Sequence, residues 1–350
     1  MLVASPASEA PEAYALMSIS HHSIARSGVK FARILLNLAA IGAGLVTFCG
    51  LFGNIWWVFE LLDHPRGQYC LILLGAIAVN TISQTRWVWV LLVPLALNLA
   101  LILPLFLPSA TPPQSAETLR VLHLNLDRHN TNFTGVARYI EQTDADIVFL
   151  QEVTPTWLTE IESQVSRYEV RLSRAQNDTQ GVALLVPVEP FADIEIVNTQ
   201  IIHLPERSTR PLIETQIRWE NTDTVLLSLH VIRSRNAGTS DYQKIEFASV
   251  ARWSQEQAAQ NRQAIVIGDF NSTPWSDRLR QLLGTSGLTN SLAGWGLHTT
   301  WPAYLPPPLR IPIDLCLHSP SLATLSRKIG PPLGSDHLPL WVEFGMENGE

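Results

Sequence analysis

Long apolar runs dominate the first third of the chain, and alternating polar and apolar positions fill the remainder. The runs cover residues 31–59, 69–82 and 87–107, and only five charged residues lie between positions 31 and 107. A helix needs about 20 apolar residues to cross a bilayer. The first and third runs meet this length, and the second does so if Asn80, Thr81 and Ser83 lie at the interface. The pattern predicts about three transmembrane helices within residues 31–107, with the lipid bilayer as their partner.

Basic residues at the start of the first run indicate its orientation. Arg26, Lys30 and Arg33 lie there, and the cytoplasmic flanks of membrane helices carry an excess of Lys and Arg. Three crossings then place the rest of the chain outside the cytoplasm, in the periplasm if the source is a Gram-negative bacterium, whereas two crossings would place it inside. A cleaved signal peptide is the alternative, but it has one short apolar stretch. We therefore expect an integral protein of the bacterial inner membrane with an extracytoplasmic domain.

The composition of the chain also changes where the last apolar run ends, after residue 107. Residues 108–116 are rich in Pro and Ser, which resist helix and sheet. The sequence therefore predicts an N-terminal tail over 1–30, a membrane region over 31–107, a linker over 108–116 and a catalytic domain over 117–350. That domain carries 19 Lys and Arg against 27 Asp and Glu, a net charge of −8. It lacks the basic stripe that grips long nucleic acids, which disfavours a long duplex as partner.

Periodicity within the domain predicts an α/β fold. Short apolar or alternating runs predict strands over residues 119–124, 147–150, 181–186, 225–229 and 264–267. Helical spacing is found over 135–143 and 242–260. Polar residues of catalytic type follow several of these strands, and others lie near the C-terminus: Asn125, Asp127, Glu152, His230, Asp269, Asn271, Asp314, Asp336 and His337.

These residue types fit metal-assisted chemistry. Carboxylate and amide oxygens are the ligands that Mg²⁺ prefers, and histidines beside acids transfer protons or neutralise charge. A single acid at a strand end is more often a turn or helix cap, so the argument depends on the whole set.

The order of the motifs resembles the endonuclease/exonuclease/phosphatase superfamily. The matching segments are LHLNLD with Asn125, Gln151-Glu152, LSLHV with His230, Gly268-Asp269-Phe270-Asn271, Ile313-Asp314 and Ser335-Asp336-His337. The resemblance covers residues 119–344 and implies a four-layer α/β sandwich. In that fold two mostly antiparallel sheets pack face to face with helices outside, and here the N-terminal transmembrane region precedes it.

The resemblance also implies roles at a metal site. Glu152 corresponds to the principal metal ligand, with Asn125 beside it. Asp336 corresponds to a further metal-site acid, and Asp127 matches an acid found in only some branches. The implied cofactor is Mg²⁺, with Mn²⁺ as a possible substitute.

The remaining motif residues correspond to the catalytic groups. By resemblance, Asp269 orients or deprotonates the attacking water and Asn271 holds the nucleophile or the phosphate. His337 contacts the scissile phosphate, Asp314 orients His337, and His230 binds phosphate or assists the leaving group. The implied reaction is in-line attack of water on phosphorus.

Three functions remain open at this point. The first is a phosphodiesterase acting on a lipid headgroup or small phosphoester, which the membrane region and the acidic domain favour. The second is an extracytoplasmic nuclease, for which Trp275, Trp295 and Trp301 are candidate stacking residues, although packing in the core or rim explains them as well. The third is a catalytically silent membrane receptor or scaffold, which would be expected to have broken motifs. The sequence does not determine the oligomeric state.

Overall fold

The computed structural model describes the backbone of residues 10–82, 84–107 and 117–346, with side chains from residue 28 onward. The predicted linker of residues 108–116 lies outside the described residues, as do residues 1–9 of the predicted tail.

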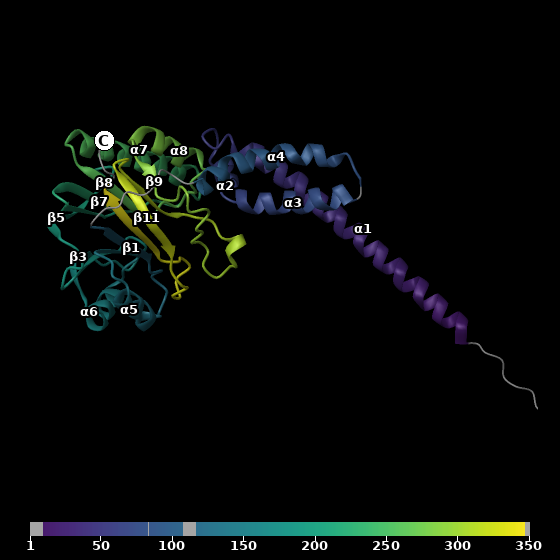
Figure 1. Cartoon of the computed structure of the whole chain (residues 1–350), viewed down its shortest axis with the longest axis horizontal. Helices are drawn as coiled ribbons and strands as arrows, with labels where there is room; N and C mark the ends of the chain where they lie inside the picture. The colour runs from purple at the N-terminus through teal and green to yellow at the C-terminus, as the bar shows by residue number, and fades with distance from the viewer. Residues whose placement is uncertain (1–9, 83, 108–116, 347–350) are drawn as a thin grey trace, which may run out of the picture.

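The N-terminal region consists of helices that extend away from the domain (Figure 1). In chain order they are α1 (Ala10–Gly50), α2 (Trp57–Asp63), α3 (Arg66–Ile82), α4 (Trp87–Ile102) and the 3₁₀ helix η1 (Leu103–Phe106). The apolar run of residues 31–59 is therefore not one helix. Its first part belongs to α1, a turn follows Gly50, and α2 begins at Trp57. Gly53 in this turn faces Glu60 so closely that a Cβ atom would overlap the carboxyl group.

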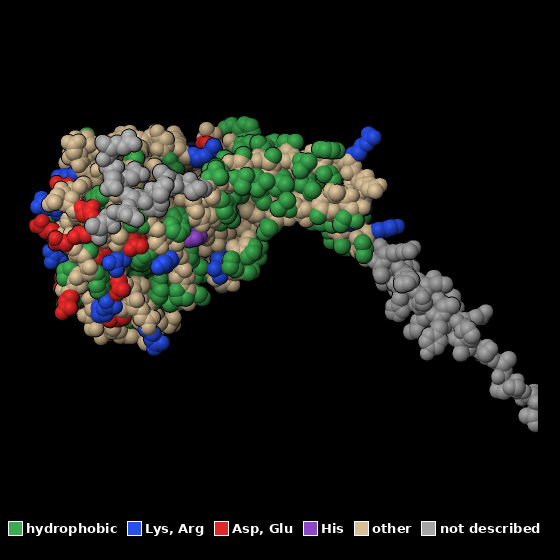
Figure 2. All heavy atoms as spheres, in the orientation of Figure 1, with side chains coloured by type: hydrophobic (Ala, Val, Ile, Leu, Met, Phe, Trp, Pro, Cys, Tyr) green, Lys and Arg blue, Asp and Glu red, His purple; other side chains and the backbone are tan. Residues whose placement is uncertain are grey.

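Two helices of the described chain are long and apolar enough to cross a bilayer. They cover Gly28–Gly50 and Trp87–Phe106, and only 22% and 33% of their most apolar windows are buried. The third candidate, Arg66–Ile82, is apolar but shorter, with 17 residues. Figure 2 shows hydrophobic side chains spread over the surface of these helices. Two of the three predicted helices thus have spanning length.

The domain contains two six-stranded sheets. The first sheet has the order β11-β12-β1-β2-β4-β3 and the second has the order β5-β6-β7-β8-β10-β9. The strands of the first sheet are β1 (Leu119–Asn125), β2 (Ile147–Gln151), β3 (Tyr168–Arg174), β4 (Val182–Pro187), β11 (Leu322–Ile329) and β12 (Leu340–Met346). Those of the second are β5 (Ile194–Ile202), β6 (Leu212–Trp219), β7 (Thr222–His230), β8 (Gln263–Asp269), β9 (Thr289–Asn290) and β10 (Asp314–His318).

Helices cover both outer faces, which confirms the predicted four-layer sandwich. α5 (Phe133–Gln142) and α6 (Pro155–Gln164) pack on the first sheet, and α7 (Ala237–Ala259) and α8 (Asp277–Ser286) on the second. η2 (Pro307–Leu309) is a short 3₁₀ helix in the loop before β10. Most strand pairs are antiparallel, but β1 pairs with β2 and β7 with β8 in parallel.

Alternation along the strands sorts their side chains between the layers. In β1, Leu119 and Val121 face the second sheet, whereas Leu122 and Leu124 face α5 and α6. In β8, Ile265 and Ile267 face the first sheet. Because successive side chains point to opposite faces of a sheet, the strand-end residues in step with this inner set point into the space between the sheets.

Candidate active site

The sheet topology brings the predicted site residues to one end of the sandwich. β1 and β2 are parallel, so Asn125 lies opposite Gln151 at their carboxyl ends. β7 and β8 are also parallel, and His230 lies opposite Asp269. β10 runs the other way, so its first residue, Asp314, pairs with Asp269. β12 is antiparallel to β1, and the loop before it carries Asp336 and His337 to the same end.

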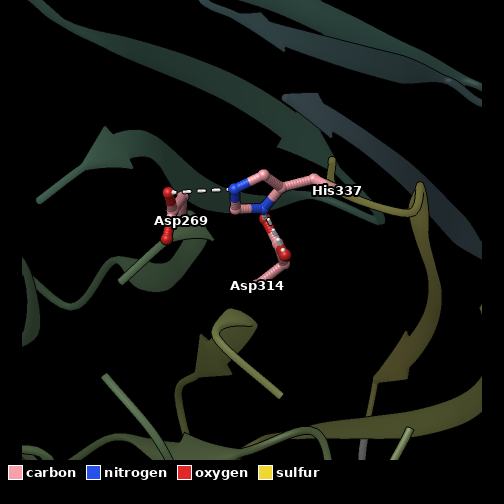
Figure 3. A group of neighbouring side chains, drawn as sticks. All are labelled: Asp269, Asp314 and His337. Atoms are coloured by element: carbon pink, nitrogen blue, oxygen red, sulfur yellow. Dashed lines mark hydrogen bonds and ion pairs between the residues drawn. The ribbon is translucent and has the colours of Figure 1, made fainter. Parts of the chain in front are cut away.

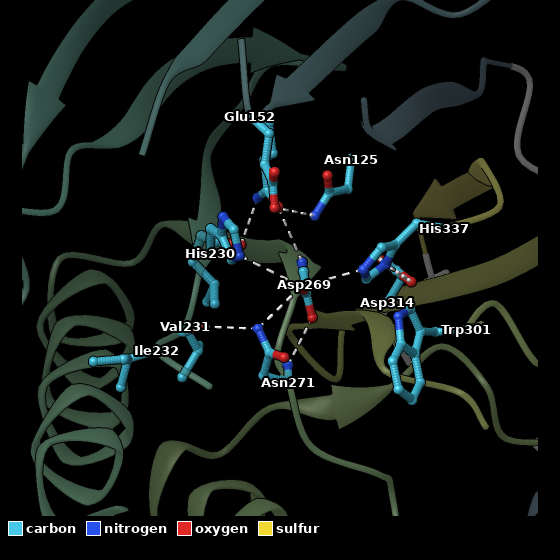
Figure 4. A network of polar contacts seen from close by, with 12 residues as sticks. Asn125, Glu152, His230, Val231, Ile232, Asp269, Asn271, Trp301, Asp314 and His337 are labelled. Atoms are coloured by element: carbon cyan, nitrogen blue, oxygen red, sulfur yellow. Dashed lines mark hydrogen bonds and ion pairs between the residues drawn. The ribbon is translucent and has the colours of Figure 1, made fainter. Parts of the chain in front are cut away.

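Glu152 and Asn125 form the first-sheet side of the site (Figure 4). The Asn125 amide donates to Glu152 Oε1 at 3.3 Å, and its Oδ1 accepts from the backbone N–H of Asp127 at 3.1 Å. The second bond fixes the amide with its nitrogen toward Glu152. In this arrangement Asn125 orients the carboxylate and does not offer an oxygen beside it. Glu152 itself has φ +59°, an uncommon conformation for a residue other than glycine that often marks functional sites.

Gln151 ties the two sheets together and was not among the predicted residues. Its side chain is fully buried, donates to the carbonyl of Leu229 at 2.6 Å and accepts from the backbone N–H of Asp269 at 3.4 Å. The alternation in the sequence could have identified Gln151, because it places this residue on the inner face of β2 with Ile147 and Phe149. A polar residue there must find a partner between the sheets.

Asp269 and Asn271 form the second-sheet side. Asp269 Oδ1 accepts from the Asn271 backbone at 2.8 Å, and Oδ2 accepts from the Asn271 amide at 3.0 Å. The same amide donates to the carbonyl of Val231 at 3.0 Å, and Asn271 has φ +46°. These bonds hold the loops after β7 and β8 against each other.

His337 lies between two aspartates (Figure 3). Its Nδ1 is 2.9 Å from Asp314 Oδ2, and its Nε2 is 3.7 Å from Asp269 Oδ2. Behind it, His123 Nε2 lies 3.2 Å from Asp314 Oδ1. All four side chains are buried. His123 was not predicted, although its place two residues before Asn125 puts it on the same face of β1.

The other predicted residues lie at the edges of this cluster. His230 Nε2 is 3.5 Å from Asp269 Oδ2. Asp336 is exposed on one side, and its Oδ2 accepts from the Trp301 indole N–H at 3.0 Å. Asp127 is half-buried at the rim, where its side chain accepts from the backbone of His129. Among the described residues Asp127 forms no hydrogen bond with Glu152, Asp269 or Asp314, but its charge contributes to raising the pKa of Glu152.

Burial and mutual charge set the protonation of the aspartate–histidine cluster. Burial alone would lower the pKa of His337, but the Asp314 and Asp269 carboxylates raise it to about 10. Burial would raise the pKa of Asp314, yet the charge of His337 and the hydrogen bonds from both histidines hold it below its usual range. Burial raises the pKa of Asp269 to about 7 despite the opposing charge of His337. His337 is therefore cationic at neutral pH, and Asp269 is poised to exchange a proton.

Glu152 is the better candidate for a divalent ion. Burial raises its pKa, and it forms no ion pair with a basic side chain of the described chain. A partly buried carboxylate in this situation is stabilised by a nearby cation. The buried atoms of Asp269, Asp314 and His337 also lie within 4.8 Å of one another. Both oxygens of Asp314 already serve His337 and His123, however, and Mg²⁺ prefers oxygen ligands. The residues present thus fit an ion at Glu152 better than one inside the cluster.

Comparison with known proteins agrees with this fold. The chain is similar to TDP2 from D. rerio, solved with a single-strand DNA product, at 17% identity and a TM-score of 0.53, over 65% of this chain and 99% of that one. It is similar to an endonuclease/exonuclease/phosphatase from Bacteroides vulgatus at 16% identity and 0.52, over 66% and 99%. A mannosyl-6-phosphatase from Bacteroides thetaiotaomicron gives 17% and 0.50, over 65% and 99%.

At such identities these structures establish the fold and not the substrate. No functionally curated protein matches the sequence. The sequence profile described as the Endonuclease/Exonuclease/phosphatase family matches residues 122–337, from the middle of β1 to the histidine of the cluster. The chain therefore belongs to the endonuclease/exonuclease/phosphatase family.

Proposed function

We propose that this chain is a metal-dependent phosphoester hydrolase that directs water onto phosphorus. The observation that carries the proposal is the buried array of Asp269, His337 and Asp314 at the same sandwich end as Glu152. Such an array combines a proton acceptor with a fixed positive charge, which is what attack on a phosphate requires.

The side chains divide the work in this proposal. Asp269 accepts the proton of the attacking water, while Asn271 fixes Asp269 and the loop around it. His337, held cationic by Asp314, neutralises charge on the phosphoryl oxygens. His230 contacts the phosphate as a neutral ring, because burial and the charge of Arg210 lower its pKa well below the usual value.

Glu152 is the proposed anchor for the metal. With Asn125 orienting it and Asp336 as a further acid, it would hold Mg²⁺, for which Mn²⁺ is a substitute of similar ligand preference. A bound ion supplies Lewis acidity to the phosphoryl oxygens and the leaving group.

The proposed substrate is a lipid headgroup or another small phosphoester. Beside the site, the guanidinium of Arg233 lies 4.9 Å above the Trp301 ring, which also contacts Asp336. One exposed arginine in this place suits a single phosphate group. The face of Trp301 below Arg233 is covered, and Trp275 is buried with its indole bonded to the Asp63 carbonyl. Both facts weaken the case for base stacking. Nuclease activity remains the second candidate, favoured by the fold of the DNA-bound TDP2.

Hydrolysis by the full chain in detergent tests this function. The substrates are a chromogenic phosphodiester, phospholipid vesicles, and single- and double-stranded DNA, each with Mg²⁺ or with EDTA. We expect Mg²⁺-dependent hydrolysis with phospholipid or the small diester preferred over DNA. Glu152→Gln should also weaken Mn²⁺ binding at least about tenfold, measured by electron paramagnetic resonance without any substrate. Hydrolysis that persists in EDTA, or unchanged Mn²⁺ binding, would contradict the metal site, and preference for DNA would favour the nuclease.

We also propose that α1, α3 and α4 all cross a membrane, with the 17 residues of α3 at the short end of the spanning range. Three crossings from a cytoplasmic N-terminus place the catalytic domain outside the cytoplasm. The support is their exposed apolar side chains, including Leu38, Leu45, Trp89 and Val93, each at least half exposed. Burying this surface in lipid is strongly favourable at about 25 cal/mol per Å². The chain should stay in the pellet when membranes are washed with alkaline carbonate and enter solution with detergent. Release by carbonate alone would exclude embedding, and protease added to intact spheroplasts checks which side the domain occupies.

A further inference from the structure

The N-terminal helical region and the catalytic domain share one hydrophobic core. Leu73 of α3 and Leu91 and Leu95 of α4 belong to the same buried cluster as Leu279 and Leu282 of α8. Polar contacts cross the same boundary: the Trp275 indole donates to the Asp63 carbonyl at 2.9 Å, and His64 Nδ1 lies 3.1 Å from Thr273 Oγ1. Thr273 and Trp275 lie two and four residues after Asn271, so the helical region touches the loop whose Asn271 fixes Asp269.

Gln243 of α7 fastens two active-site loops. Its amide nitrogen donates to the carbonyl of Ile232 at 2.9 Å and to that of Asn271 at 3.4 Å. Ile232 follows His230 by two residues, and Figure 4 shows Val231 of the same loop bonded to Asn271. One side chain therefore holds the backbone of both loops.

Arg278 of α8 sets the direction of the Gln243 amide. Its guanidinium donates to Gln243 Oε1 at 2.6 Å, which leaves the amide nitrogen facing the two carbonyls. A further guanidinium nitrogen donates to Ser240 Oγ. Arg278 is only 3% exposed and Gln243 only 1%. A cation buried to this degree requires a counter-charge close by.

Glu60 of α2 supplies that counter-charge. It is 1% exposed, and its Oε1 lies 3.8 Å from Arg278 Nε. Burial lowers the pKa of Arg278, and nearby carboxylates oppose this shift. Glu60 opposes it most, ahead of Asp241 and Asp277. α2 lies directly beside α8 where the helical region meets the domain (Figure 1). Glu60 thus lies at the start of a series of contacts that runs through Arg278 and Gln243 to Asn271.

We propose that Glu60 is a positioning residue for the active site, acting through Arg278 and Gln243 on the loops of His230 and Asn271. The helical region is then a structural part of the catalytic site as well as an anchor. This inference rests on the proposed phosphoester hydrolysis.

Two substitutions, measured in the full chain in detergent, test separately the contact of Glu60 with Arg278 and the contacts of Gln243 with the two loops. Glu60→Gln keeps the shape and removes the counter-charge. Gln243→Glu keeps an acceptor for Arg278 and removes both donors to the loop carbonyls. Since a displacement of about 1 Å at a reacting group costs about a hundredfold, we expect each to lower kcat on the chromogenic phosphodiester about tenfold, with KM within about twofold. The double variant should resemble Gln243→Glu alone, because residues acting in series are not additive.

Asp146→Asn is the matched control. Asp146 is also buried and also paired with an arginine: its Oδ2 accepts from the Arg120 backbone at 2.8 Å, at the opposite end of β2 from Glu152. It should leave kcat unchanged below the unfolding temperature. If E60Q does not fold, E60D takes its place, since it keeps the charge and withdraws it by one methylene.

The outcomes separate this inference from the proposed function. If Asp269→Asn abolishes hydrolysis while both test variants behave like the control, the positioning role is wrong and the hydrolase stands. Additive losses in the double variant would also overturn the series Glu60–Arg278–Gln243. If Asp269→Asn itself leaves hydrolysis intact, the proposed function fails first.

Discussion

Replacement of Asp269 by asparagine should lower kcat at least about a hundredfold, the usual contribution of a positioned general base. The substitution is isosteric and keeps an oxygen for the Asn271 backbone bond, but it removes the group that accepts the proton. Asp269 is 2% exposed and lies between His230 and His337. Stopped assays of the full chain at saturating substrate measure the effect.

The fold of this variant must be shown to be intact. Near-ultraviolet circular dichroism and the thermal midpoint should match the unsubstituted chain or exceed it, because removing a buried carboxylate relieves a desolvation cost. Near-normal kcat in a folded Asp269→Asn chain would remove Asp269 from the reaction.

Replacement of His337 by glutamine should lower kcat by a similar factor, about 10² to 10³. Glutamine can donate to a phosphoryl oxygen but carries no charge. Removal of His337 also leaves the Asp314 and Asp269 carboxylates without the cation between them. The loss should appear in kcat more than in KM if the charge acts on the transition state.

The pH dependence of hydrolysis tests the role of His337 through its partner Asp314. His337 is cationic below its pKa of about 10, so hydrolysis should fall as pH rises through that value. Asp314 contributes most to raising this pKa. Asp314→Asn should therefore move the alkaline limb of the kcat profile toward neutral pH, where an ordinary histidine titrates. An alkaline limb that stays in place would separate His337 from the activity.

Much of the site could be predicted because it lies at strand ends. Asn125, Glu152, His230 and Asp269 each end or directly follow a short apolar run, and alternation places three of them on the inner face. The predicted roles of these residues stay predictions, while their convergence at one end of the sandwich is observed. His123 lies two residues before the end of β1, so attention to the strand ends alone misses it. Gln151 is the last residue of β2, and only its place on the inner face distinguishes it from the neighbouring Glu152.

Some elements and contacts of the fold were not predicted from the sequence, and the burial of their side chains shows why. β5 is an edge strand with no fully buried residue, so its alternation is shallow. β6 does alternate, with Ile213 and Ile217 buried and Arg218 exposed, and this pattern could have predicted it. The contact of α2 with α8 could not be predicted, because a charged turn between apolar runs reads equally as a solvated loop. Only the packing shows Glu60 and Asp63 to be buried.

The most direct test of the central claim is to follow the oxygen of water into the product. The full chain in detergent would hydrolyse the chromogenic phosphodiester in H₂¹⁸O with Mg²⁺, and ³¹P NMR would report the isotope on phosphorus. We predict one ¹⁸O in the phosphate product of the unsubstituted chain and negligible product from Asp269→Asn. Label found on the released alcohol, or equal product from both chains, would contradict attack of water on phosphorus at this site.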